Sequence, residues 1–229
     1  MNNTRAILFD LDNTLVDFRL MKEQACRAAV KGMVNAGLTM REDEAYARLM
    51  DTYFKVGIES DSAFTKFLED IGQFDHKLLA AAINEYLNTK LGFVKPYPHV
   101  KSVLRKLQRK GIALAVVTDA PKTKAYQRLL LMKIESYFKF VAGFEDTSMP
   151  KQTGLPLIKA LELLKNELPE LVNSDVLMIG DSIERDLLPA KRLGLKTALC
   201  KYGHTINERM VGDYELLEIN DIARIISNS

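Results

Sequence analysis

The sequence has few of the residues that build disulfides or zinc sites, with 2 cysteines and 3 histidines among 229 residues. Cys26 and Cys200 show no CxxC spacing and no Cys/His cluster, which predicts small core residues in a reducing compartment. His76, His99 and His204 are too scattered to argue for zinc.

Long apolar runs and a strong charge imbalance are also missing. No uninterrupted apolar stretch approaches the roughly 20 residues that cross a bilayer. The first apolar run begins at Ala6, which leaves no room before it for the charged region and the apolar core of a signal peptide. The 32 basic and 30 acidic side chains leave a net charge of +2, which indicates neither a nucleic-acid nor an acidic partner. We therefore expect a cytoplasmic protein with no membrane and no nucleic-acid partner. The sequence does not decide between a monomer and a homodimer.

Between Arg19 and Leu91 the pattern is helical almost throughout. Apolar residues recur at helical spacing, and turn signals at 37–39, 57–62 and 72–75 divide the segment into about four helices. Two prolines, Pro96 and Pro98, then disfavour helix and suit a linker.

The rest of the chain alternates strands and helices, which favours a parallel sheet covered on both faces. After a first strand at 6–9, strands are predicted at 112–118, 139–143, 175–180, 195–199 and weakly at 214–219, and helices at 99–110, 121–132, 154–166, 185–193 and from Asp221. The predicted fold is α/β: a doubly wound, Rossmann-like parallel sheet core with a small all-helical cap domain. The predicted core comprises residues 1–17 and 96–229, and the cap comprises residues 18–95.

Acidic side chains stand where three of the predicted strands end. Asp10 and Asp12 follow the first strand, Thr118 and Asp119 stand at the end of the second, and Asp181 follows the apolar run 176–179 and Gly180. Ligands bind outside the carboxyl ends of the strands in open parallel sheets, so these groups are expected to share one site.

Carboxylates crowded at one edge would repel one another without a cation. An oxygen-only donor set suits Mg²⁺, with Asp10, Asp12 and Asp181 as its predicted ligands. Asp186, five residues after Asp181, either reaches the same cation or caps the following helix.

Such a site can transfer a phosphoryl group. Asp10 is best placed to attack phosphorus and form an aspartyl-phosphate, while Asp12 protonates the leaving alkoxide and later deprotonates the attacking water. Thr118 offers a hydroxyl and Lys151 a positive charge to the phosphoryl oxygens. Asp119 either contacts the substrate or caps a helix.

The residues resemble, in order, the four motifs of the haloacid dehalogenase superfamily: Asp10-Leu11-Asp12-Asn13-Thr14, Thr118, Lys151 and Gly180-Asp181-Ser182-Ile183-Glu184-Arg185-Asp186. The resemblance covers essentially the whole chain. It implies that Asp10 is nucleophile and metal ligand, that Asp12 is acid/base and a ligand through its backbone carbonyl, and that Asp181 completes the ligands, with Asp186 supporting the metal.

Within that superfamily the helical insert resembles the cap of the phosphoglycolate-phosphatase-like and dehalogenase-like branches. Dehalogenases lack the acid/base aspartate, so Asp12 favours a Mg²⁺-dependent phosphatase acting on a small phosphorylated metabolite. Asn13 replaces a frequent glycine but tolerates the left-handed backbone that the turn requires. The loop after Lys151 lacks the usual prolines.

Two other functions remain open on the sequence alone. A phosphotransferase or phosphomutase acting on a sugar phosphate would use the same intermediate, and a catalytically silent binding or regulatory module would keep only the fold. The basic series within 101–110 is interpreted as the solvated face of an amphipathic helix.

Overall fold

The computed structural model describes residues 4–203 and 212–227, and His204 lies outside these ranges. The chain divides into two compact units, one made of Met1–Asp17 with Lys95–Ser229 and the other of Phe18–Val94. Among the described helices, none combines the length and the apolar character needed to cross a membrane.

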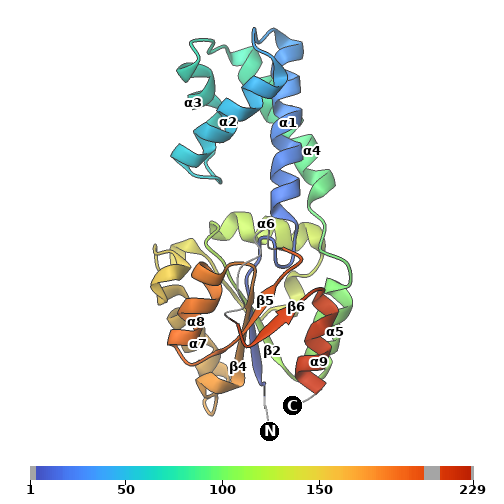
Figure 1. The fold of residues 1–229 in the computed structure, drawn as a ribbon, viewed down its shortest axis with the longest axis vertical. Helices are drawn as coiled ribbons and strands as arrows, with labels where there is room; N and C mark the ends of the chain where they lie inside the picture. Colours follow the sequence, from blue (N-terminus) through green and yellow to red (C-terminus); the bar gives the residue numbers. More distant parts are fainter. Residues whose placement is uncertain (1–3, 204–211, 228–229) are drawn as a thin grey trace. The chain divides into compact units, whose positions relative to one another are not determined.

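A parallel sheet forms the centre of the larger unit (Figure 1). Its strands in the described ranges, β1 to β6, lie in the order β3-β2-β1-β4-β5-β6. Their bounds are β1 (Ala6–Phe9), β2 (Ala113–Val117), β3 (Val141–Ala142), β4 (Val176–Gly180), β5 (Lys196–Cys200) and β6 (Tyr214–Leu216). The first strand is therefore central, between β2 and β4.

Helices cover both faces of this sheet. They are α5 (Val100–Arg109), α6 (Lys122–Met132), α7 (Leu155–Glu167), α8 (Leu188–Arg192) and α9 (Ile222–Ser227). Figure 1 shows α7 and α8 on one side of the sheet and α5 and α9 on the other. This arrangement confirms the predicted Rossmann-like α/β fold.

Burial on both faces explains why the strands are apolar at successive positions rather than at alternate ones. Every residue of β1, β2 and β4 is buried. On one face Leu8 and Met178 belong to a cluster that also contains Leu157 and Leu161 of α7. On α5, by contrast, the basic residues of 101–110 are exposed, as predicted for a solvated face.

The predicted helix at 185–193 is wrong in its start and its type. A π-helical turn, Ile183–Leu187, comes first, and α8 begins only at Leu188. Pro189 has no N–H to donate to the carbonyl of Arg185, so one regular α-helix cannot continue through both residues.

The predicted strands at 139–143 and 214–219 are both shorter than expected, with β3 reduced to Val141–Ala142 and β6 ending at Leu216. The cause of the second difference is local. The Asp221 carboxylate accepts hydrogen bonds from the backbone N–H groups of Leu217 and Glu218, at 2.9 and 3.1 Å. Those donors are therefore taken up by a helix-capping interaction and cannot extend the strand.

The smaller unit contains four described helices, α1 (Phe18–Ala36), α2 (Glu42–Val56), α3 (Ala63–Asp70) and α4 (His76–Phe93). The long helices α1 and α4 lie side by side (Figure 1). Gly32 permits this approach, because a Cβ there would stand 2.7 Å from Cγ of Glu85. Met33, Leu49 and Phe67 belong to the buried cluster of this unit, which has its own core.

Candidate active site

The register of the central strands brings the predicted chemical groups to one edge of the sheet. Phe9 is level with Val116 of β2 and with Ile179 of β4. The residues that follow these strands, Asp10, Thr118 and Asp181, therefore emerge next to one another. The backbone N–H of Asp10 donates to the carbonyl of Ile179 at 2.8 Å, which extends the strand pairing as far as Asp10.

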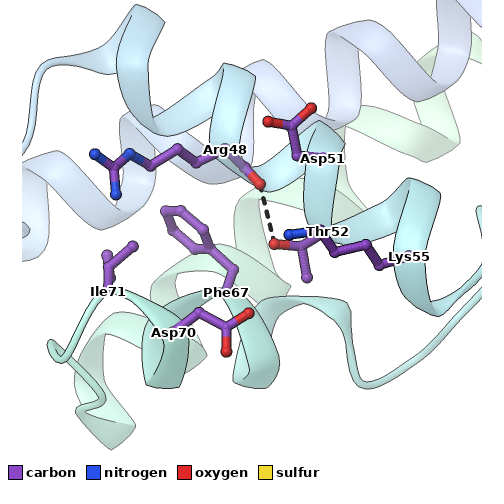
Figure 2. Close-up of a pocket in the computed structure, with 7 residues that line it drawn as sticks. All are labelled: Arg48, Asp51, Thr52, Lys55, Phe67, Asp70 and Ile71. Atoms are coloured by element: carbon purple, nitrogen blue, oxygen red, sulfur yellow. Dashed lines mark hydrogen bonds between the residues drawn. The ribbon is translucent and has the colours of Figure 1, made fainter.

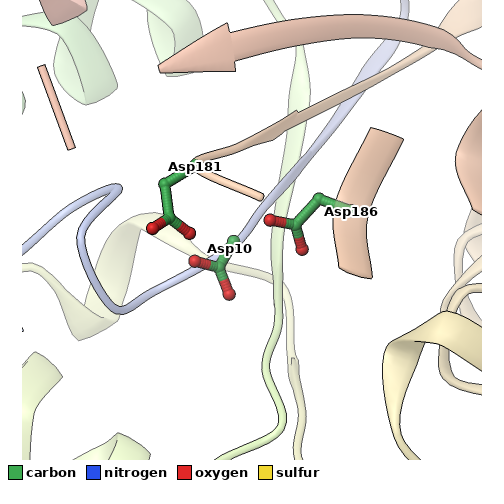
Figure 3. A group of neighbouring side chains, drawn as sticks. All are labelled: Asp10, Asp181 and Asp186. Atoms are coloured by element: carbon green, nitrogen blue, oxygen red, sulfur yellow. The ribbon is translucent and has the colours of Figure 1, made fainter. Parts of the chain in front are cut away.

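Three aspartates converge at this edge (Figure 3). One carboxylate oxygen from each of Asp10, Asp181 and Asp186 lies within 4.8 Å of the other two. Their exposed fractions are only 4%, 6% and 0%, so water screens their charges poorly. The cluster therefore has the composition of a site for a hard cation.

Burial and mutual repulsion raise the pKa values of two of these carboxyls. Burial, followed by the charges of Asp10 and Asp186, raises the pKa of Asp181 to about 7. Burial likewise raises the pKa of Asp186 to about 6, although Lys151 opposes the shift. A bound cation would relieve the repulsion and favour the ionised forms of both side chains.

Lys151 supplies the positive charge closest to this cluster. Its ammonium group is buried and donates to the carboxylates of both Asp10 and Asp186. Burial alone would lower the pKa of Lys151, but the neighbouring carboxylates outweigh it and the pKa lies above its ordinary value. The lysine is therefore charged.

The loop that carries this lysine is tied to the end of β2. Lys151 begins a 3-10 turn, Lys151–Thr153, and its backbone N–H donates to the carboxylate of Asp119 at 2.8 Å. The residue directly before α6 is Pro121, so Asp119 anchors the lysine loop rather than capping that helix. Sequence reasoning missed this link, because the two residues lie 32 positions apart.

Asp186 both stabilises its own turn and faces the other aspartates. Its carboxylate accepts from the backbone N–H of Ser182 at 3.0 Å, while the Ser182 hydroxyl accepts from the N–H of Arg185 at 3.2 Å. Gly180 makes room for this carboxylate, because a Cβ at that position would overlap the Asp186 side chain. Ser182, not Asp186, is therefore the side-chain cap of this turn, and the helix α8 that follows has no side-chain cap. The Asp186 carboxylate bonds to the backbone N–H of the capping residue and lies among the other two aspartates.

The turn after β1 holds Asp10 in place. Asn13 has a φ of 61°, which confirms that this asparagine accepts the left-handed backbone. The hydroxyl of Thr14 donates to Asp10 at 3.1 Å, and the carbonyl of Thr14 accepts from the Tyr202 hydroxyl at 2.9 Å. Thr14 therefore links Asp10, the candidate nucleophile, to Tyr202 from the later part of the chain.

Thr118 lies at the end of the neighbouring strand and is buried. Its hydroxyl oxygen accepts from the backbone N–H of Ala120 at 3.1 Å. Because that bond uses the oxygen, the hydroxyl proton is directed elsewhere and suits donation to an anion. This geometry is compatible with the phosphate contact predicted for Thr118.

Asp12 is placed differently from the other aspartates. Its carboxylate is not part of the cluster of three, and it instead forms a 3.4 Å ion pair with the Arg128 guanidinium from α6. Arg185 similarly lies 3.7 Å from Asp181. Both arginines were missed by sequence reasoning, although the i, i+4 spacing of Arg185 and Asp181 was a signal.

The smaller unit has a pocket of its own, of about 130 Å³ (Figure 2). It is lined by Arg48, Asp51, Thr52, Lys55, Phe67, Asp70 and Ile71. Arg48 pairs with Glu44 and Asp70 with Lys66, each at 3.1 Å. These ion pairs account for much of the charge there, so the pocket is a weaker candidate than the aspartate cluster.

Comparison with known proteins identifies the class. The family model described as haloacid dehalogenase-like hydrolase matches residues 7–200, so the chain belongs to that family. The fold agrees, because the HAD phosphatase of Thermococcus onnurineus superposes with a TM-score of 0.70 at 20% identity, covering 97% of both chains.

Two curated relatives narrow the class to a branch. A glyceraldehyde 3-phosphate phosphatase of Methanocaldococcus jannaschii is 30% identical, covering 98% of this chain and 97% of its own. A phosphoglycolate phosphatase of Aquifex aeolicus is 29% identical with the same coverage. The chain is thus a phosphoric monoester hydrolase of the phosphoglycolate-phosphatase-like branch, as the resemblance predicted.

Proposed function

We propose that this enzyme is a Mg²⁺-dependent phosphatase that hydrolyses a small phosphomonoester through an aspartyl-phosphate on Asp10. The observation that carries the proposal is the convergence of Asp10, Asp181 and Asp186 beside the ammonium group of Lys151. A carboxylate held among acidic groups and one buried cation suits a nucleophile that works beside a metal ion.

The donor set fits Mg²⁺. Asp10 and Asp181, with the backbone carbonyl of Asp12, would hold the ion, and Asp186 would support them from its turn. Mg²⁺ supplies charge neutralisation at the phosphoryl oxygens and favours the ionised carboxylates. Histidine and cysteine are absent from the cluster of described residues, which argues against a softer metal.

In the first chemical step, an Asp10 carboxylate oxygen attacks phosphorus and forms a new O–P bond. The bond from phosphorus to the substrate oxygen breaks, and that oxygen takes the proton of Asp12. Thr118 donates a hydrogen bond to a phosphoryl oxygen, and Lys151 supplies positive charge. This step leaves Asp10 phosphorylated, Asp12 ionised and the dephosphorylated alcohol free.

In the second step, Asp12 removes a proton from a water molecule as the water oxygen attacks phosphorus. The bond between phosphorus and Asp10 breaks, so inorganic phosphate is released and both aspartates return to their starting states. One residue thereby serves as acid and then as base.

The relatives act on glyceraldehyde 3-phosphate and on phosphoglycolate. We propose a substrate of the same class, a phosphate ester of a short oxygenated carbon chain. We also propose that the insert, residues 18–95, is a cap domain that selects the leaving group, and that residues 1–17 and 96–229 form the catalytic domain.

The test is release of phosphate from p-nitrophenyl phosphate, phosphoglycolate and glyceraldehyde 3-phosphate, with Mg²⁺ and with a chelator. We expect turnover with Mg²⁺ only, and a loss of at least about a thousandfold in Asp10→Asn. Acid quenching during turnover, followed by mass spectrometry, should find phosphate on the peptide that contains Asp10. Asp175→Asn, just before β4 at the other edge of the sheet, is the matched control and should remain active. Normal turnover in Asp10→Asn would contradict the mechanism.

A further inference from the structure

Among the described residues, Arg128 is the largest of the fully buried side chains by volume. It lies on α6, on the face that also carries the buried residues Ala125, Leu129 and Met132. Removing a guanidinium from water is costly unless it meets an opposite charge. The structure supplies that charge, because Nη1 of Arg128 lies 3.4 Å from Oδ2 of Asp12.

The Asp12 carboxylate, which pairs with this arginine, stands apart from the aspartate cluster. Asp10, Asp181 and Asp186 form the acidic cluster in the described part of the chain, and the Asp12 carboxylate does not belong to it. The Asp12 side chain is 22% exposed, so it borders solvent, whereas the Arg128 side chain is only 2% exposed. A buried group thus meets a more accessible one.

We propose that Arg128 is a positioning residue that holds the Asp12 carboxylate where it can exchange a proton with the leaving-group oxygen. The inference rests on the proposed function, in which Asp12 is the acid and base. Arg128 itself keeps its protons throughout: the proton passes from Asp12 to the leaving oxygen as the bond from that oxygen to phosphorus breaks.

Replacing a purely structural arginine and replacing a positioning arginine should differ in how the loss of activity depends on the leaving group. A substrate with a poor leaving group needs protonation when its bond to phosphorus breaks, whereas p-nitrophenolate is stable enough to leave unprotonated. A misplaced Asp12 therefore harms the poor leaving group more. A general loss of folded or correctly packed enzyme harms both substrates equally.

The experiment compares kcat/KM for phenyl phosphate and p-nitrophenyl phosphate, two substrates of similar shape. This parameter reports the steps up to departure of the leaving group. For Arg128→Gln we expect a fall of about tenfold or more with phenyl phosphate and of less than about threefold with p-nitrophenyl phosphate. Arg128→Lys keeps the positive charge and should recover part of the loss. If Arg128→Gln does not fold, the same comparison of the two substrates is made with Arg128→Lys.

Two further variants separate the explanations. Leu129→Ala, a buried neighbour on α6, should lower the melting temperature without changing the ratio between the substrates. In the Asp12→Asn background, Arg128→Gln should add little, because an arginine that acts through Asp12 has no further effect once the carboxylate is gone.

Equal losses with both substrates in Arg128→Gln, or additive losses in the double variant, would overturn the proposal while leaving the proposed function intact. If Asp12→Asn itself shows no dependence on the leaving group, the acid role of Asp12 fails and the Arg128 proposal fails with it. A selective loss in both single variants supports both assignments.

Discussion

The carboxylate of Asp119 accepts a 2.8 Å hydrogen bond from the backbone N–H of Lys151, and so joins the end of β2 to the turn that carries the buried lysine. The lysine in turn contacts Asp10 and Asp186. One backbone hydrogen bond therefore helps to position the ammonium group of Lys151 beside the aspartates.

Removing this anchor should impair catalysis more than stability. We expect Asp119→Ala to lower kcat/KM for p-nitrophenyl phosphate by about tenfold, since a hydrogen bond to a charged acceptor contributes about 1.5–3 kcal/mol. Asp119→Asn keeps an acceptor oxygen and should stay within about threefold of the wild type. Asp146 is not a member of the aspartate cluster, and Asp146→Ala removes a similar 2.8 Å bond to the N–H of Gly143 together with an ion pair to Lys122, so this variant should change the rate little. Equal losses in Asp119→Ala and Asp146→Ala would contradict the anchoring role.

The close approach of Gly180 to the Asp186 carboxylate predicts a steric effect on the proposed metal site. In Gly180→Ala the new Cβ would displace the Asp186 carboxylate, so we expect a higher Mg²⁺ concentration for half-maximal activity and a lower melting temperature. Gly92→Ala is the control, because a Cβ there has no neighbour within 4 Å and alanine favours helix by about 1 kcal/mol. An unchanged Mg²⁺ requirement in Gly180→Ala would count against the assignment of Asp186.

Lys151 offsets two buried negative charges, so its removal should destabilise the metal-free enzyme. We expect Lys151→Met to lower the free energy of unfolding by about 3–5 kcal/mol, the usual cost of breaking a buried ion pair. Adding Asp186→Asn should recover part of this loss. Lys159→Met breaks an exposed pair with Glu162 and should cost less than about 1 kcal/mol. Urea unfolding of the variants in the presence of a chelator measures the differences.

The raised pKa values of Asp181 and Asp186, about 7 and about 6, predict how stability depends on pH without metal. Between the ordinary carboxyl pKa and these values, the folded state holds protons that the unfolded chain has released. Their contribution therefore favours folding at low pH and is lost as pH rises from about 4 to about 7.

Melting temperatures of chelator-treated protein across this range should show that decline, and Asp181→Asn should flatten it. Mg²⁺ should reverse the trend, because the ion binds the ionised carboxylates and stabilises the folded state more as pH rises. A flat wild-type profile, matched by Asp181→Asn, would show that these carboxyls titrate normally.

The sequence allowed the sheet and much of the aspartate cluster at its edge to be predicted because the relevant signals are local. A short apolar run followed by Asp10, or by Gly180 and Asp181, marks a buried strand and its carboxyl end without knowledge of the rest of the chain. The left-handed turn at Asn13 followed from its residue type in the same way.

The contacts that orient these groups depend on packing between distant segments. The link from Asp119 to Lys151 requires the exact course of a loop, and the pair of Arg128 with Asp12 requires the rotation of α6 against the sheet. One signal for Arg128 was present, since a lone arginine shares a helix face with Ala125, Leu129 and Met132. A charged residue at a core position indicates a buried partner.

The central place of β1 has a consequence for how the chain is made. Ala6 pairs with Ala113 on one side and with Val176 on the other, so both partners of the first strand are translated after the whole helical insert. During synthesis this apolar strand therefore leaves the ribosome without its partners, and its hydrogen bonds can form only after most of the polypeptide has been translated. Such non-local pairing slows folding and leaves the nascent strand exposed to chaperones and to other chains in the meantime.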